Sequence, residues 1–262
     1  MRFPSPLVPG ILIRRYKRFL ADVRLRSGRL VTAHCANSGS LLGCKTPGSS
    51  VLLSRHANRR RTLRYTWEMV RVGRVWVGVN TMHPNRLVEA AIARGVLQEL
   101  LGYDRIRREV RINPRSRLDL CLERPADRCY VEVKNVTLGV AGVAAFPDAV
   151  TERGTRHLRE LIRLHRRGRR AALVFVIQRA DCLSFRPADE IDPVYGRWLR
   201  RAAAEGVDVL PYQARVTPRG IALRHRLPLI LETPKKTPGD DPRNLATVRR
   251  LLGMTPQLAG SR

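Results

Sequence analysis

The segment RLDLCLERPADRCYVEVKNVT, residues 117–137, consists of two apolar-rich stretches on either side of a turn at Pro125. Alternating apolar and polar residues in each stretch predict two strands that pair as a hairpin. Because side chains alternate along a strand, Glu132 and Lys134 share one face. The hairpin would place Asp119 opposite Glu132, or nearly so. We therefore expect two carboxylates and one ammonium group on a single face of a sheet.

This arrangement has a chemical and a structural interpretation. Two adjacent carboxylates repel each other and lose hydration on a half-buried face, so a cation is needed beside them. A hard divalent cation, Mg²⁺ or Mn²⁺, fits such oxygen ligands, and a nearby lysine can orient an activated water or offset phosphate charge. The alternative is that Asp119, Glu132 and Lys134 form solvated cross-strand pairs. A register that pairs Asp119 with Val133 would break the arrangement altogether.

Outward from the hairpin, the chain alternates helical and strand-like patterns. Asn80 to Pro84 marks a boundary, and we expect a second domain over residues 81–232. Its order predicts an α/β (α+β) domain with a mixed sheet covered by helices. The expected helices are residues 85–101, with a break near Gly95 as the alternative, 151–166 and 193–204. The expected strands are 106–112, 117–122, 130–137, 171–178, 207–212 and 221–223. Residues 233–262 are rich in Thr, Pro, Gly and charge, which predicts a flexible tail.

Residues 1–80 have a different pattern, in which short strands alternate with turns. The expected strands are 11–16, 19–25, 30–34, 51–54, 63–70 and 75–79. Five or six short strands in this length predict a small barrel, and an OB-fold is the commonest barrel that binds nucleic acids. An SH3-like barrel would have the same pattern.

The charge of the chain indicates a polyanionic partner. The 262 residues include 50 Lys and Arg against 22 Asp and Glu, a formal net charge of +28. Residues 1–80 contain 16 basic and two acidic residues, so half of the excess lies in less than a third of the chain. DNA bound through its backbone is the partner that we expect, and RNA stays open.

Basic and aromatic residues cluster in two places within the first domain. The aromatic residues include Phe19 in the first cluster and Trp67 in the second. The expected DNA contacts there are Arg14, Arg15, Tyr16, Lys17 and Arg18, followed by Arg59, Arg60, Arg61 and Arg64. Cations neutralise phosphates while exposed rings stack on bases. This combination favours binding of single strands or of the backbone without sequence preference, so single-stranded nucleic acid is a further possible partner. Burial of Phe19 and Trp67 in the core is the alternative for the rings.

The helix at 151–166 adds a further candidate contact region. Thr151 is an expected N-cap, and Arg153 and His157 lie four residues apart on one face. Free amides at such a helix end can bind phosphate, so Arg153 and His157 are further expected DNA contacts. A solvated basic face explains the same pattern equally well.

Signals for other cell compartments are missing from the sequence. Prolines interrupt the apolar start of the chain, and the longest apolar run, residues 171–177, is too short to cross a bilayer. The five cysteines form no CxxC pair, which favours reduced thiols over disulfides or a zinc site. We expect a cytoplasmic protein with no membrane contact.

The spacing Asp119…Glu132-x-Lys134 on consecutive strands resembles the PD-(D/E)xK nuclease-like superfamily. The chain is further identified as a member of the sugar fermentation stimulation protein A family, over roughly residues 1–232. The matching segments include residues 15–23, 43–48, 65–68, 78–81, 130–138, 146–151 and 191–193. Leu118 stands where the superfamily has its proline, and the tail has no counterpart in the family.

The resemblance implies an N-terminal OB-fold, a nuclease-like second domain, non-specific DNA binding and a regulatory role in sugar (maltose) utilisation. It implies Asp119, Glu132 and Lys134 as catalytic residues, with Glu89 joining the two carboxylates as a metal ligand. Glu89 is preferred to Glu99 because it lies on the body of its helix. In the implied mechanism Lys134 positions a metal-activated water for in-line attack on a phosphodiester. A purely DNA-binding regulatory protein without turnover is the alternative.

Overall fold

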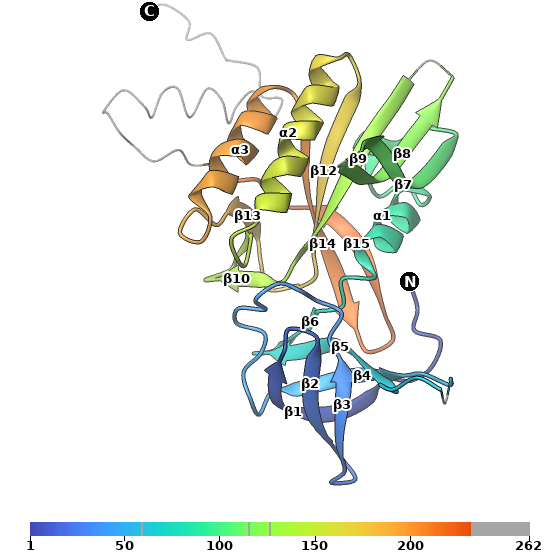
Figure 1. Cartoon of the computed structure of the whole chain (residues 1–262), viewed down its shortest axis with the longest axis vertical. Coiled ribbons are helices and arrows are strands. Elements are labelled where there is room, and N and C mark those ends of the chain that lie inside the picture. The colour runs from blue at the N-terminus through green and yellow to red at the C-terminus, as the bar shows by residue number, and fades with distance from the viewer. Residues whose placement is uncertain (59, 115, 126, 232–262) are drawn as a thin grey trace, which may run out of the picture.

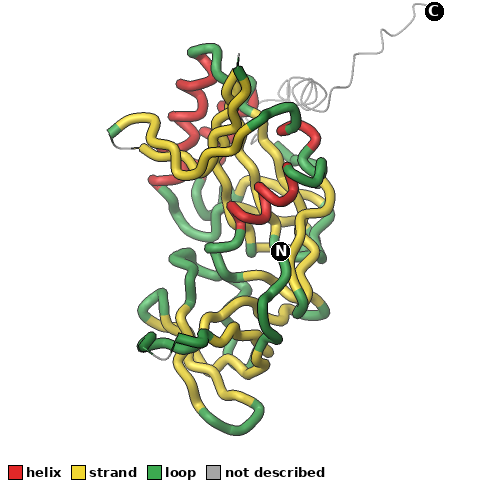
Figure 2. Tube along the Cα trace, turned by 90° about the vertical axis from the view of Figure 1, so that its right-hand side faces the viewer, coloured by secondary structure: helices red, strands yellow, loops and turns green. Residues whose placement is uncertain are grey.

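The structure is a computed structural model that describes residues 1–231 apart from residues 59, 115 and 126 (Figure 1). The expected tail, residues 233–262, and the expected DNA contact Arg59 lie outside the described residues. Figure 2 shows two bodies stacked along the long axis, with the N-terminal barrel at one end. Within the described ranges, no helix is both long and apolar enough to cross a membrane.

The first domain is a β-barrel, as predicted. Its strands are β1 (Val8–Tyr16), β2 (Leu20–Leu25), β3 (Leu30–His34), β4 (Ser50–Arg55), β5 (Tyr65–Val72) and β6 (Val75–Gly78). They follow the order β3-β2-β1-β4-β5-β6, and an additional parallel pairing of β3 with β5 closes the barrel. Leu12, Val23 and Trp67 are fully buried in its core. Alternation of apolar and polar side chains along each strand fills this interior.

The second domain contains the remaining elements. They are α1 (Pro84–Ile92), η1 (Gln98–Leu100), β7 (Arg105–Asn113), β8 (Ser116–Arg124), β9 (Asp127–Val136), β10 (Leu138–Val140), β11 (Val143–Phe146), α2 (Glu152–Arg166), β12 (Arg170–Ile177), β13 (Ser184–Pro187), α3 (Pro193–Ala204), β14 (Asp208–Thr217) and β15 (Gly220–Arg226). The main sheet has the order β15-β14-β12-β9-β8-β7, in which β12 pairs in parallel with both β9 and β14. The mixed sheet that the sequence predicts is therefore confirmed.

Helices cover both faces of this sheet (Figure 1). On one face, Leu87 and Val88 of α1 share a core with Val131 and Val133 of β9. On the other face, α2 and α3 pack together over a second core that contains Phe175 of β12. Because β9 alternates, Glu132 and Lys134 point to the side opposite Val131 and Val133, as expected.

The structure differs from the expected elements in three places. The helix expected over 85–101 ends at Ile92, and Gly95 adopts a left-handed conformation (φ 72°) that stops it, which is the break that the sequence offered as the alternative. The three strands β10, β11 and β13, each of three or four residues, were not predicted and form a separate small sheet. Met1 and Arg2, which the sequence assigns to the barrel, pair with β15 of the second domain instead.

A buried carboxylate joins the barrel to the second domain. Glu68 of β5 is 4% exposed, and it accepts hydrogen bonds from Ser54 Oγ (2.6 Å) and Asn80 Nδ2 (2.9 Å). Its Oε2 also lies 2.7 Å from Nε2 of His83, at the start of α1. Burial acts to raise the pKa of Glu68, but the hydrogen bonds from His83, Ser54 and Asn80 outweigh it, so the pKa is lowered. An ionised Glu68 thus anchors the start of α1 to the barrel.

We expect Glu68→Gln to lower the free energy of unfolding at pH 7 by about 2 kcal/mol, since hydrogen bonds to a buried charge contribute about 1.5–3 kcal/mol. The lowered pKa means that this contribution is present above the ordinary glutamate value of 4.5 and is lost as the pH falls below it. Urea denaturation of variant and wild type at pH 7 and at lower pH measures both effects.

Glu205→Gln is the matched control for that experiment. In the part of the chain that the structure describes, the Glu205 carboxylate forms only surface ion pairs, with Arg166 and Arg201, so its loss should leave stability close to that of the wild type. Equal effects of the two substitutions would contradict the anchoring role of Glu68.

Candidate active site

The β8–β9 hairpin forms as the sequence predicts. Its paired residues run from Arg124 opposite Asp127 to Leu120 opposite Val131, and the next step of that register places Asp119 across from Glu132. Instead of a further backbone pair, the backbone N–H of Val133 donates to Asp119 Oδ2 at 2.8 Å. A carboxylate is therefore held at the point where the ladder between the two strands ends.

Asp119 is held in a setting that disfavours its charge. Its other oxygen, Oδ1, accepts a hydrogen bond from Asn85 Nδ2 of α1 at 2.9 Å. Burial raises the pKa of Asp119, and the negative charge of Glu132 raises it further, against the lowering effects of Val133, Asn85 and Lys134. The fold keeps two carboxylates close enough to repel each other.

Glu132 lies deeper than Asp119 and is paired. The residue is 3% exposed, and its Oε1 accepts a hydrogen bond from Lys134 Nζ at 2.6 Å and contacts His157 Nδ1 of α2. Burial acts to raise its pKa, but the charge of Lys134 and the contacts with His157 lower it overall. The second oxygen, Oε2, is buried without a partner in the described part of the chain. It is the one carboxylate oxygen of the pair that has no hydrogen bond there.

The structure places His157 in the interior, whereas the sequence predicted it on a surface that contacts DNA. It is 4% exposed, and its Nδ1 also lies 3.3 Å from Lys134 Nζ. The expected N-cap is confirmed, since Thr151 Oγ1 accepts from Gly154 N. His157 is among the buried residues of α2, together with Leu158 and Leu161. His157 is thus a partner of Glu132 and Lys134.

Glu89, the expected third carboxylate, is not part of this cluster. Its side chain forms a two-pronged ion pair with Arg108 of β7. Across the described residues, no group of three or more His, Cys, Asp or Glu side chains is arranged to hold a metal ion. The sequence did not single out Asn85, which lies one helical turn before Glu89 and contacts Asp119 in its place.

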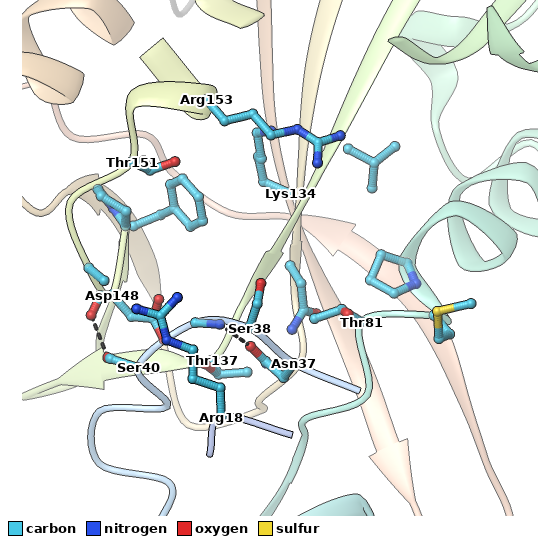
Figure 3. Close-up of a pocket in the computed structure, with 18 of the residues that line it drawn as sticks. Arg18, Asn37, Ser38, Ser40, Thr81, Lys134, Thr137, Asp148, Thr151 and Arg153 are labelled. Carbon is cyan, nitrogen blue, oxygen red and sulfur yellow. Dashed lines mark hydrogen bonds between the residues drawn. The ribbon is translucent and has the colours of Figure 1, made fainter. Parts of the chain in front are cut away.

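Asp119 and Lys134 line a cleft of about 940 Å³ between the two domains. Figure 3 shows Lys134, Thr151 and Arg153 on the second-domain side and Arg18 with the loop that contains Asn37 and Ser38 on the barrel side. The cations that line it include Arg18, Lys45, Lys134 and Arg153, against the acidic Glu109, Asp119 and Asp148. The cleft therefore brings Asp119, Lys134 and basic side chains of both domains to one space.

The two walls of the cleft are joined by hydrogen bonds. Asp148 accepts from Leu41 N through Oδ2 at 2.8 Å, and its backbone carbonyl accepts from Ser40 Oγ (Figure 3). Gly39 lies so close to the Asp148 carboxylate that a Cβ at this position would be 2.8 Å from Asp148 Oδ1. These residues are more than 100 positions apart in the sequence, so the sequence did not indicate the contact.

The first basic cluster is divided between structural and exposed side chains. Arg15 donates to backbone carbonyls of Arg18, Asn37, Gly39 and Ser40, so it holds the cleft loop in place. The predicted contacts Arg14 and Tyr16 both bind Asp22, with the Arg14 guanidinium also over the Tyr16 ring. Lys17 and Arg18 are exposed in a turn where both have positive φ.

The second basic cluster lies away from the cleft. Arg60 and Arg61 are exposed in the loop between β4 and β5, and Arg64 is half-buried. None of the three lines the cleft. Of the two aromatic candidates, Phe19 is 48% exposed, whereas Trp67 is fully buried in the barrel core.

Comparisons with known proteins agree with this architecture. Residues 13–79 match the SfsA N-terminal OB domain, and residues 82–220 match the sugar fermentation stimulation protein RE domain. A sugar fermentation stimulation protein homolog of Geobacter sulfurreducens is 58% identical over 230 residues, covering 88% of this chain and 99% of its own. A homolog of Geotalea daltonii is 57% identical over 231 residues, covering 88% of this chain and all of its own.

A solved structure is also similar over most of the chain. It is the structure of Pyrococcus furiosus SfsA in complex with Ca²⁺, which is 31% identical and superimposes with a TM-score of 0.81. The match covers 88% of this chain and 98% of that one. Both domains and their order are therefore shared with proteins of known structure.

We expect Asp119→Asn to raise the free energy of unfolding at pH 7 by about 1 kcal/mol, the size typical of stabilising substitutions. The change removes a charge that burial and Glu132 disfavour, and rotation of the Asn85 amide preserves both hydrogen bonds. The pKa of Asp119 is raised in the fold above its ordinary value of 3.8. The wild type therefore loses stability as the pH rises from 3.8 through the raised pKa. The gain should therefore shrink as the pH is lowered.

Urea denaturation from pH 7 downward tests this expectation. Asp208→Asn, which alters a half-exposed carboxylate paired with Arg170, is the control and should give no gain. A loss of stability in Asp119→Asn at pH 7 would show that Asp119 is not strained by its surroundings.

Proposed function

Because the chain belongs to the sugar fermentation stimulation protein family, with an OB domain followed by the family's RE domain, we propose that it binds DNA without sequence preference and cleaves phosphodiesters with a divalent metal. The observation that carries this proposal is the position of Asp119 and Lys134 in the wall of a basic cleft. A phosphodiester bound by the cations of the cleft would lie beside these two side chains.

The donor atoms of the site suit a hard cation such as Mg²⁺ or Mn²⁺. Asp119 and Glu132 would hold it together with the Val133 carbonyl, and Glu132 Oε2 is a buried oxygen with no partner among the described residues. A bound cation would supply a water of lowered pKa and would offset phosphate charge. The similar Pyrococcus furiosus protein was solved in complex with Ca²⁺, which also prefers oxygen ligands.

The protein's own side chains have separate roles in this proposal. Lys134 Nζ, fixed by Glu132 Oε1 at 2.6 Å, orients the attacking water and stabilises negative charge that develops on the phosphate. His157 contacts both Glu132 and Lys134 from behind, so it restricts their orientation. Arg153, exposed at the start of α2 and lining the cleft, binds a neighbouring phosphate.

The alternative is a regulatory DNA-binding protein without cleavage, which the family resemblance would connect to sugar (maltose) utilisation. One observation favours it. Glu132 is held by Lys134 and His157 and does not line the cleft, while Glu89 pairs with Arg108. Carboxylates bound in this way are less available to a metal.

A cleavage assay with Lys134→Ala separates the two functions. We expect wild-type protein to cut plasmid or oligonucleotide DNA with Mg²⁺ or Mn²⁺. The cleavage rate of Lys134→Ala should be lower by a factor of about 100 or more, as when one group that stabilises developing charge is removed. DNA binding should persist in the variant. Arg215→Gln, at an exposed position of β14 that does not line the cleft, is the control. If the wild type shifts DNA but never cuts it, the regulatory alternative holds.

The salt dependence of binding tests the role of the cleft cations. On duplex DNA the log–log slope of affinity against salt changes by about 0.9 for each phosphate contact, so Arg153→Gln should reduce the slope by about 1. Arg14→Gln is the matched control, because the Arg14 charge already pairs with Asp22 at 2.8 Å. Fluorescence anisotropy at several salt concentrations gives both slopes. Equal slopes for Arg153→Gln and wild type would remove Arg153 from the binding surface.

A further inference from the structure

We infer that the cleft between the barrel and the second domain takes a single strand of DNA in preference to a duplex. This inference rests on the proposed function, since it names the substrate class of the same site. Four properties of the cleft carry it: its size, the hydrogen bonds that join its walls, its unpaired cations and its exposed apolar side chains.

The cleft has the size of a pocket for small ligands. Its volume of about 940 Å³ lies near the upper end of the range of roughly 300–1,000 Å³ found for small-molecule sites. A few nucleotides of one strand fit such a space. A double helix needs room for the second strand as well, and only one edge of it could enter.

Contacts between the domains restrict opening of the cleft. Asp148 of the second domain accepts hydrogen bonds from Ser40 and Leu41 of the barrel loop. A separate link joins the domains where Gly78 N donates to the Gln178 carbonyl at 2.9 Å. A Cβ at Gly78 would lie 2.2 Å from Gln178 Oε1, so the backbone there is in close contact with the second domain. Widening the cleft for a duplex would break these contacts.

Cations line the cleft from both sides. Arg18 and Lys45 come from the barrel and Arg153 from α2, and all three side chains are exposed. Within the described residues none of the three pairs with a carboxylate, whereas Arg14 at the barrel surface and Arg108 of the second domain do. Unpaired cations on facing walls match a phosphodiester backbone that passes between them.

Two strongly exposed apolar side chains lie among these cations. Met82, in the segment before α1, is 70% exposed, and Val150, just before α2, is 73% exposed. Both line the cleft. Met82 and Val150 have no ring on which a base can stack, but they offer apolar contact to base faces, which are more accessible in a single strand than in a duplex, where neighbouring pairs cover them. This pairing of cations with apolar surface distinguishes a single-strand site from a purely electrostatic one.

The experiment measures affinity for a labelled 12-nucleotide oligo-dT and for a blunt 12-base-pair duplex by fluorescence anisotropy. Both are measured with wild-type protein in EDTA, so that no cleavage occurs. We expect the single strand to bind at least tenfold more tightly than the duplex. The double variant Met82→Ser/Val150→Ser should weaken single-strand binding several-fold and leave duplex binding unchanged.

Leu183→Ser is the matched control, because Leu183 is 80% exposed but does not line the cleft. It should bind both probes like the wild type. Duplex binding as tight as single-strand binding, or no effect of the double variant on the single strand, would overturn the inference and leave DNA binding itself intact. If neither probe binds, the proposed function fails together with the inference.

Discussion

Burial of the Glu132 carboxylate is the constraint around which the second domain is arranged. A carboxylate that is almost inaccessible to water must have positive or hydrogen-bonding partners. Lys134 supplies one from the same face of β9, and His157 supplies the other from α2. The contact between His157 and Glu132 therefore adds to the apolar contacts of α2 in setting the face that the helix presents to the sheet.

Charge is distributed unevenly between the two carboxylates of the pair. Glu132 is stabilised as an anion, whereas burial and the charge of Glu132 disfavour ionised Asp119. Asp119 accepts a backbone hydrogen bond where the strands would otherwise pair, so the local fold depends on the same side chain that lines the cleft. A group that the fold keeps in an unfavourable state is common at functional sites, since function and stability there have different requirements.

The sequence predicts the parts of the site that depend on local patterns. The hairpin, the opposition of Asp119 and Glu132, and the N-cap at Thr151 follow from strand alternation, turn residues and capping rules. The position of His157 does not, because a helix with basic residues on several faces does not reveal which face is buried. The link between Asp148 and the barrel loop joins residues 107 positions apart, and no local pattern encodes it. The same reason explains why Glu89, chosen by its place on the helix, pairs with Arg108 instead.

The pairing of Met1 and Arg2 with β15 has a topological consequence. Residues 1–3 pair with the second domain, the chain crosses to the barrel before Val8 and it returns after Gly78, so the barrel is attached at two places, the first of them through hydrogen bonds. A domain attached by one linker can swivel about it, but a domain attached by two has only the axis through both crossings left for rotation. The second attachment therefore restricts swivelling of the barrel, which favours a cleft whose two walls keep a fixed relation to each other.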